Sequence, residues 1–144
     1  MGATPAQVRA ALNSYIEAWT TGNKALLLSV FAEDASFCDP VGTPEFVGHD
    51  GIGRFWDFAR QDAGRTMTPA LEEIRACGSE GILRFTMQVR IPVENKGLNL
   101  SVIEYVLVDD SGKIKSLRAF WDETNFSVPE GMEMFSPNVA EAYE

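Results

Sequence analysis

The order of the predicted elements indicates an α+β domain, with helices first and a meander of antiparallel strands last. Apolar residues recur at helical spacing near the N-terminus, whereas residues 82–123 alternate between apolar and polar with a period of two. Turn-forming residues separate the alternating stretches. Because each helix must bury its apolar stripe, we expect the helices to cover one side of a curved sheet.

Two helices are predicted before the first strand. Thr4 supplies an N-cap hydroxyl, Pro5 occupies the first helical position, and Gly22 ends the first helix. Asn23 can cap a second, leucine-rich helix over residues 24–31. The apolar stripe of the first helix consists of Val8, Ala11, Leu12, Tyr15, Ile16 and Trp19.

A short strand and a third helix follow. Residues 35–39 form an apolar run that should end at Pro40, because the residue before a proline is held extended. After a loop over residues 42–48, Asp50 is expected to cap a helix over residues 51–61. This helix carries Ile52, Phe55, Trp56 and Phe58.

Four strands are predicted in the second half of the chain, over residues 71–76, 82–93, 98–108 and 114–123. Hairpin turns are expected at residues 94–97 and 109–112. Residues 1–126 thus make one domain, and residues 127–144 form a polar, acidic tail.

Composition narrows the possible partners. The 144 residues are 45% apolar and carry a formal net charge of −9, which disfavours nucleic acid and anionic membranes because phosphate binding needs clustered cations. The sequence shows no membrane-spanning run and no signal peptide, so we expect a cytoplasmic protein. Cys38 and Cys77 lack metal or disulfide spacing and are expected to be small buried thiols.

Three polar side chains lie on faces that are otherwise apolar. Glu104 is the charged member of the aliphatic even positions of residues 98–108, Tyr15 lies in the stripe of the first helix, and Asp39 shares parity with Ala35 and Phe37. Burial would raise the pKa of Glu104, and a neutral carboxyl can donate a hydrogen bond. A proton acceptor and two donors in an apolar interior indicate proton transfer on an apolar ketone.

Each of these residues also has an ordinary explanation. Glu104 is also compatible with a strand edge whose face is exposed to water. Tyr15 is compatible with an ordinary core position with its hydroxyl at the rim, and Asp39 before a proline is typical of a turn. It is the combination that favours a site. The single histidine, His49, is expected in a surface loop, so no catalytic metal is predicted.

The chain from about Val8 to Val128 resembles the ketosteroid isomerases of the nuclear transport factor 2-like superfamily. The likeness lies in residues 15–17, 31–42, 102–104 and 119–125, and the Asp39-Pro40-Val41-Gly42 segment is its most specific part. The resemblance implies a cone-shaped curved sheet wrapped on the helices, no cofactor, and a homodimer paired through the outer sheet face.

The resemblance also implies roles for individual residues. Asp39 would be the general base, and Tyr15 and Glu104 would form the oxyanion hole. The rings of a steroid, or of another small apolar ketone, would contact Phe55, Trp56, Phe85, Val89, Leu117 and Trp121.

The sequence departs from the family pattern at three positions. The family usually has Asp where Glu104 stands, and the extra methylene reaches about 1.5 Å further. Phe31 and Trp56 occupy positions at which some members have tyrosines that support the oxyanion-hole tyrosine. A polyketide cyclase, dehydratase or epoxide hydrolase of the same fold therefore stays open, as does a non-catalytic binding or dimerisation module.

Overall fold

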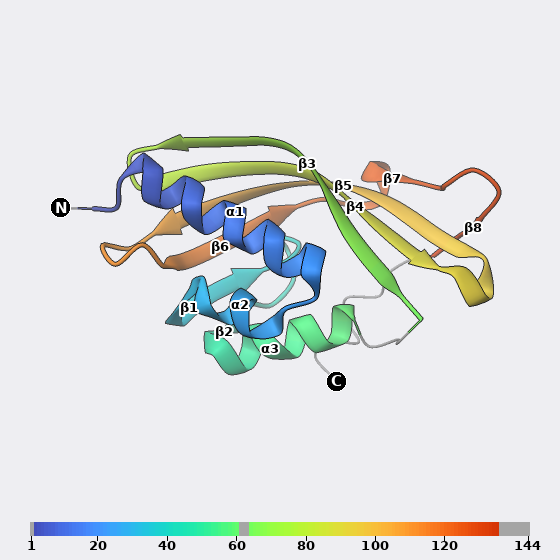
Figure 1. The fold of residues 1–144 in the computed structure, drawn as a ribbon, viewed down its shortest axis with the longest axis horizontal. Helices are drawn as coiled ribbons and strands as arrows, with labels where there is room; N and C mark the ends of the chain where they lie inside the picture. The colour runs from blue at the N-terminus through green and yellow to red at the C-terminus, as the bar shows by residue number, and fades with distance from the viewer. Residues whose placement is uncertain (1, 61–63, 136–144) are drawn as a thin grey trace.

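A curved sheet wraps over two helices in the computed structural model, which describes residues 2–60 and 64–135. Helix α1 (Pro5–Thr21) crosses the concave face of the sheet, and α3 (Gly48–Ala59) lies below it (Figure 1). The strands follow the order β2-β1-β6-β5-β4-β3, with β7 and β8 paired to β5. This arrangement confirms the predicted cone-shaped α+β fold.

The predicted strands are present, but β1 and β3 begin four and five residues earlier than predicted, and β2, β7, β8 and the two short 3-10 helices were not predicted. The strands are β1 (Phe31–Cys38), β2 (Phe46–Val47), β3 (Thr66–Cys77), β4 (Glu80–Ile91), β5 (Lys96–Val108), β6 (Ile114–Phe120), β7 (Phe126–Ser127) and β8 (Glu133–Met134). The 3-10 helices are η1 (Pro92–Glu94) and η2 (Glu123–Asn125).

The N-terminal helices form where their caps predict. The Thr4 hydroxyl accepts from the Gln7 amide, and Gly22 ends α1 in the left-handed conformation at φ 69°. Asn23 caps α2 (Lys24–Ser29), which ends earlier than predicted because Phe31 already pairs with Ile114 of the sheet.

The third helix is displaced from its predicted start. It begins at Gly48, its N-cap Val47 makes no side-chain hydrogen bond, and Asp50 lies inside the first turn, so the predicted cap was wrong. Pairing of Phe46 and Val47 with β1 brings the chain to the helix start earlier than the capping signal indicated. The predicted last residue, Gln61, lies outside the described residues.

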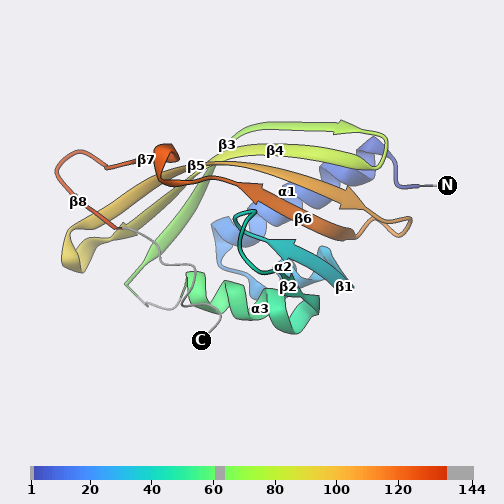
Figure 2. The same cartoon turned by 180° about the vertical axis from the view of Figure 1, so that it is seen from behind.

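The sheet is mixed and not a simple antiparallel meander. Strand β1 lies beside β6 and runs in the same direction (Figure 2). In this parallel pair, Phe37 lies opposite Leu117. A long connection separates these two strands in the chain, and parallel pairing requires such a connection. The pairing matters for the site because it brings the end of β1 beside the end of β6.

The core lies between the concave face of the sheet and the helices. Even positions of β5 and odd positions of β4 are buried, as their alternation predicted. Helix α1 approaches β4 so closely that a Cβ on Gly81 would lie 2.6 Å from a methyl of Val8. The side of α1 that carries Tyr15 therefore faces the sheet interior.

The C-terminal segment continues along β5. Phe126 pairs with Leu100 and Glu133 pairs with Lys96, so residues 126–135 lie against this strand. Residues 136–144 of the predicted tail lie outside the described residues.

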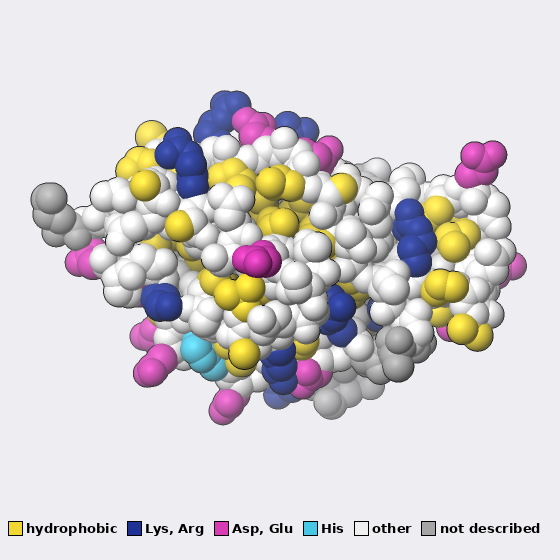
Figure 3. Space-filling model, viewed as in Figure 1, with side chains coloured by type: hydrophobic (Ala, Val, Ile, Leu, Met, Phe, Trp, Pro, Cys, Tyr) yellow, Lys and Arg dark blue, Asp and Glu magenta, His cyan; other side chains and the backbone are white. Residues whose placement is uncertain are grey.

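Charged groups of both signs are interspersed on the face that carries α1 and α3 (Figure 3). In the part of the chain that the structure describes, no helix is long and apolar enough to cross a membrane. Cys38 is buried, but Cys77 at the end of β3 is exposed, so the prediction of two buried thiols was wrong for Cys77.

Candidate functional site

Asp39 lies at the junction of β1 and β6. It directly follows β1, and the amide of Val41 donates to the carbonyl of Ala119 at 2.9 Å. The carboxylate is 9% exposed and accepts a 2.6 Å hydrogen bond from the indole nitrogen of Trp121. Pairing with β6 thus gives this buried carboxylate one strong donor.

Glu104 and Tyr15 meet deeper in the interior. Glu104 faces the core from β5 opposite Leu83 and Ala119, and it is 1% exposed. The Tyr15 hydroxyl reaches it from α1 and donates to Oε2 at 3.2 Å. Within residues 2–60 and 64–135, the other oxygen, Oε1, is buried and has no hydrogen-bond partner.

The structure brings the three predicted catalytic side chains into one buried region. Asp39 and Glu104 are the two buried charged residues in the described part of the chain. The two are linked through β6, because Ala119 pairs with Glu104 on one side and binds the segment after Asp39 on the other. The three groups thus share one interior, and their catalytic roles stay predictions.

Burial dominates the pKa of both carboxyls. It raises the pKa of Asp39 to about 6, and the hydrogen bond from Trp121 opposes the rise. For Glu104, burial and the neighbouring charge of Asp39 raise the pKa well above its usual value, against a smaller lowering by Tyr15. A pair placed in this way favours one charge over two.

The environments assign different protonation states to the two groups. Asp39 is less deeply buried and its donor favours the carboxylate, so it is ionised at neutral pH. Glu104 is almost fully enclosed beside that negative charge, so the neutral acid is favoured. If Oε2 accepts from Tyr15, the proton belongs on Oε1, where it is free to be donated to a ligand.

Two aromatic rings pack against the ring of Tyr15. Phe31 meets it edge-on at 6.2 Å between ring centroids, and Trp19 does so at 6.4 Å. Trp56 stacks on Trp19 at 4.4 Å. Of the two residues that depart from the family pattern here, Phe31 contacts the ring of Tyr15 directly and Trp56 contacts it through Trp19.

The six predicted ligand contacts occupy the concave side. Phe55 packs 4.8 Å from the ring of Phe37, and Leu117 lies opposite Phe37 in the sheet. Val89 pairs with Leu98, near the end of β5 remote from Glu104. All are buried except the half-buried Trp121: Phe55, Trp56, Phe85, Val89, Leu117 and Trp121. Their roles as substrate contacts remain predictions.

Sequence reasoning missed the hydrogen bond from Trp121. This residue was predicted only as an apolar contact, but its indole donates to Asp39. The available signal was the parity of Trp121 with Leu117 and Ala119, which puts it on the face of Asp39 once β1 pairs with β6. The parallel pairing itself was not predicted.

His49 lies apart from this constellation. It is in the first turn of α3, not in a loop, and its Nε2 is 3.0 Å from the carbonyl oxygen of Phe31. Over the described ranges, no cluster of three or more His, Cys, Asp or Glu residues could hold a metal ion.

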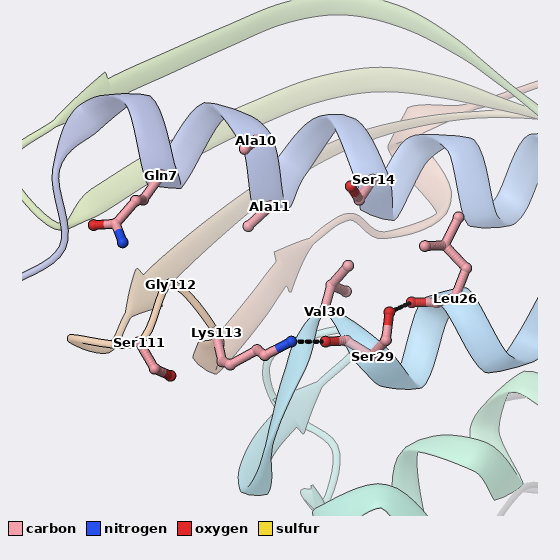
Figure 4. A pocket seen from close by; sticks show the side chains of 10 residues that line it. All are labelled: Gln7, Ala10, Ala11, Ser14, Leu26, Ser29, Val30, Ser111, Gly112 and Lys113. Atoms are coloured by element: carbon pink, nitrogen blue, oxygen red, sulfur yellow. Dashed lines mark hydrogen bonds between the residues drawn. The ribbon is translucent and has the colours of Figure 1, made fainter.

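A separate pocket of about 320 Å³ opens between α1, α2 and the turn after β5 (Figure 4). Lys113 and Ser29 face each other across it, with the ammonium 2.6 Å from the Ser29 carbonyl oxygen. None of Tyr15, Asp39 and Glu104 lines it, so this pocket is not where their chemistry would take place.

The raised pKa of Asp39 predicts a pH-dependent cost to stability. A carboxyl whose pKa rises from 3.8 to about 6 on folding stabilises the folded state when protonated, and that stability is lost as pH rises through 6. At about 1.4 kcal/mol per pKa unit, the cost at pH 7.5 is on the order of 3 kcal/mol. Asp39→Asn should therefore unfold at a higher denaturant concentration than wild type at pH 7.5. At pH 4, where Asp39 is protonated in the folded state, the two proteins should unfold at similar denaturant concentrations. Equal stability of the two proteins at pH 7.5 would contradict the buried charge.

The sequence matches a known domain family and a known enzyme. The SnoaL-like domain model matches residues 12–117. A steroid Delta-isomerase of Nocardioides simplex is 30% identical over 116 residues, which cover 81% of this chain and 90% of the relative.

Solved structures give the same fold. The epoxide hydrolase/cyclase-like enzyme SalBIII, described in pyran ring formation in the polyether salinomycin, superposes with a TM-score of 0.73. The match covers 85% of this chain and 95% of that enzyme at 20% identity, which supports the fold alone. The chain therefore belongs to the SnoaL-like domain family and, within the nuclear transport factor 2-like superfamily, to its ketosteroid isomerase-like members.

Proposed function

We propose that the protein is a steroid Δ-isomerase that moves a double bond in a 3-ketosteroid by intramolecular proton transfer. The observation that carries the proposal is the buried Tyr15–Glu104 hydrogen bond, 3.2 Å long, with the ionisable Asp39 in the same interior. A steroid Delta-isomerase is also among the relatives, at 30% identity. No cofactor is needed for this chemistry.

Asp39 would act as the general base. Its carboxylate removes a proton from the carbon between the ketone and the isolated double bond, and the electron pair moves into a dienolate. The same carboxyl then returns the proton to the far end of the conjugated system, so no atom is gained or lost. A pKa of about 6 suits both steps, because the group is ionised at neutral pH yet basic enough to accept a proton.

Tyr15 and Glu104 would stabilise the charge that develops on the ketone oxygen. Rotation about the phenol C–O bond turns the Tyr15 hydrogen from Glu104 towards the ligand, and the protonated Oε1 of Glu104 supplies a second donor. In a dry interior such donors act strongly, because little solvent screens them. Removing one typically costs about 10²–10³ in rate.

Apolar side chains on the concave face would contact the rings of the steroid. Asp39 and Trp121 lie nearer the solvent than Tyr15 and Glu104, so the ketone would enter first and bind deepest. Phe55 and Leu117 lie on the concave side beside Phe37, as a flat apolar ligand requires.

The first experiment follows the ultraviolet absorbance of the conjugated enone formed from 5-androstene-3,17-dione. Wild type should convert this substrate, and Asp39→Asn should lose about 10²–10⁴ in kcat because the base is gone. Asp34→Asn removes an exposed carboxylate from the same strand and should keep full activity. No turnover by wild type would reject the isomerase. In that case, tight pH-dependent binding of a phenolic steroid would separate another enzyme of this fold from a module without an oxyanion hole.

A second experiment tests whether Glu104 acts as a neutral donor. Glu104→Gln keeps the length and an N–H donor but cannot ionise, so kcat should fall by less than about tenfold. Glu104→Leu removes the donor and should lower kcat by about 10²–10³. KM should change little in both variants. If Gln proves as damaging as Leu, the charge of Glu104, and not its hydrogen bond, is what the reaction uses.

We also propose a homodimer formed through the outer face of the sheet, since members of the family often dimerise. Ile103 and Phe120 are cross-strand partners on this face and remain 43% and 46% exposed. A sheet with an apolar outer face gains stability when that face is covered.

Light scattering coupled to gel filtration tests the dimer. Wild type should elute with twice the 15.9 kDa chain mass, and Ile103→Glu with Phe120→Glu should shift it to one chain. Val93→Glu, at a position that is 90% exposed near the distant turn η1, should leave the dimer intact. A wild-type protein that stays a single chain at high micromolar concentration would contradict the proposal.

A further inference from the structure

The indole nitrogen of Trp19 is a buried donor whose partner the static structure does not supply. Trp19 is 3% exposed, and among the described residues its Nε1 has no hydrogen-bond partner. The indole N–H can only donate. Since the large majority of buried polar groups are paired, such an exception calls for a physical reason.

The helix places this donor next to the candidate site. Trp19 follows Tyr15 by one turn of α1, so both side chains lie on the face that packs against the sheet. Their rings meet edge-on with centroids 6.4 Å apart and an interplanar angle of 69°. The unpaired indole N–H therefore belongs to a ring that contacts the phenol of Tyr15.

Neighbouring groups hold the Trp19 ring in place. It stacks on Trp56 at 4.4 Å and meets Phe55 edge-on at 6.5 Å. Arg60 donates to the Trp19 carbonyl at 3.1 Å and its guanidinium covers the ring of Trp56 at 5.0 Å. A ring fixed on these sides is preorganised to donate in one direction.

The pKa of Tyr15 also indicates that the Trp19 N–H lies near the phenol oxygen. Burial raises the pKa of the phenol, and the charges of Glu104 and Asp39 raise it further, whereas the Trp19 side chain lowers it. A donor lowers the pKa of a phenol when its N–H faces the phenol oxygen and favours negative charge there. Phe31, the other ring against Tyr15, has no such group to offer.

We propose that Trp19 is a positioning residue whose indole N–H donates to the phenolic oxygen of Tyr15, and that this hydrogen bond strengthens when Tyr15 donates to a ligand oxygen. The part of this inference that involves a ligand rests on the proposed function. The contact between Trp19 and the Tyr15 hydroxyl is independent of which reaction the protein catalyses. In the unliganded protein, Tyr15 directs its hydrogen to Glu104 and its lone pairs are open. As charge builds on a ligand oxygen, part of it passes to the phenol oxygen, and the N–H of Trp19 stabilises it there.

The contact is tested first without ligand, by NMR of protein labelled with ¹⁵N on tryptophan. The chain has three tryptophans, so the indole N–H groups give three signals. Tyr15→Phe deletes the hydroxyl and retains the ring, so ring-current effects on Trp19 persist. The Trp19 signal should move and that of Trp121, which donates to Asp39, should stay. A Trp19 signal that does not respond would overturn the inference, whatever reaction the protein catalyses.

The ligand-linked part uses estradiol, a phenolic steroid, at a concentration shown to saturate by its fluorescence. The Trp19 indole proton should move downfield on binding to wild type, because its hydrogen bond strengthens. In Tyr15→Phe loaded with the same probe, this downfield movement should be absent. A movement of equal size in both proteins would show that Trp19 responds to the ligand directly and not through Tyr15, which contradicts the proposed role.

A double-mutant cycle separates positioning from packing. Trp19→Phe should lower kcat about fivefold with KM nearly unchanged, as expected for loss of one buried hydrogen bond. In the Tyr15→Phe background, the same substitution should have little further effect, because the oxygen it serves is gone. Equal losses of kcat in both backgrounds would assign Trp19 a packing role only. If the protein catalyses no isomerisation, the NMR experiments still decide whether the contact exists.

Discussion

One electrostatic constraint organises the site: two carboxyls are buried in the same interior, and charging both is unfavourable. The two carboxyls have different surroundings, so one of them is charged and the other is neutral. Asp39 receives a 2.6 Å hydrogen bond from Trp121 and is 9% exposed, whereas Glu104 is 1% exposed and feels the charge of Asp39. The first is therefore ionised and the second neutral at pH 7, since burial without strong donors favours the uncharged form. Two groups of the same chemical type thus differ in protonation because of their positions.

The fold buries Asp39 and Glu104 in one interior, away from water. Strand β6 is central, because it pairs in parallel with β1 and antiparallel with β5, and so places the end of one strand beside the middle of another. Helix α1 then brings Tyr15 down onto Glu104, and its close approach to β4 at Gly81 fixes the depth of the helix. The rings of Trp19 and Phe31 pack against Tyr15, which is 2% exposed. Each arrangement depends on contacts between residues remote in sequence.

Much of this could be predicted from the sequence, because period-two alternation already shows which face of a strand is buried. Glu104 stood out as a carboxyl on an aliphatic face, and burial in the structure agrees with that. What could not be predicted depends on pairing between distant strands. The parallel β1–β6 ladder, the donor role of Trp121 and the start of α3 at Gly48 all follow from such pairing. Local capping preference favoured Asp50, but pairing of the preceding residues with β1 placed the helix start three residues earlier.

The protonation state of Glu104 is the most direct test of the account, and infrared spectroscopy reads it without substrate. At pH 8, exposed carboxyls and Asp39 are ionised, so a carbonyl band of a protonated carboxylic acid should remain from Glu104. This band should shift on deuteration and vanish in Glu104→Gln, whereas Asp39→Asn should leave it in place. If wild type at pH 8 shows no such band, both buried carboxyls are charged, and the division into base and neutral donor is wrong.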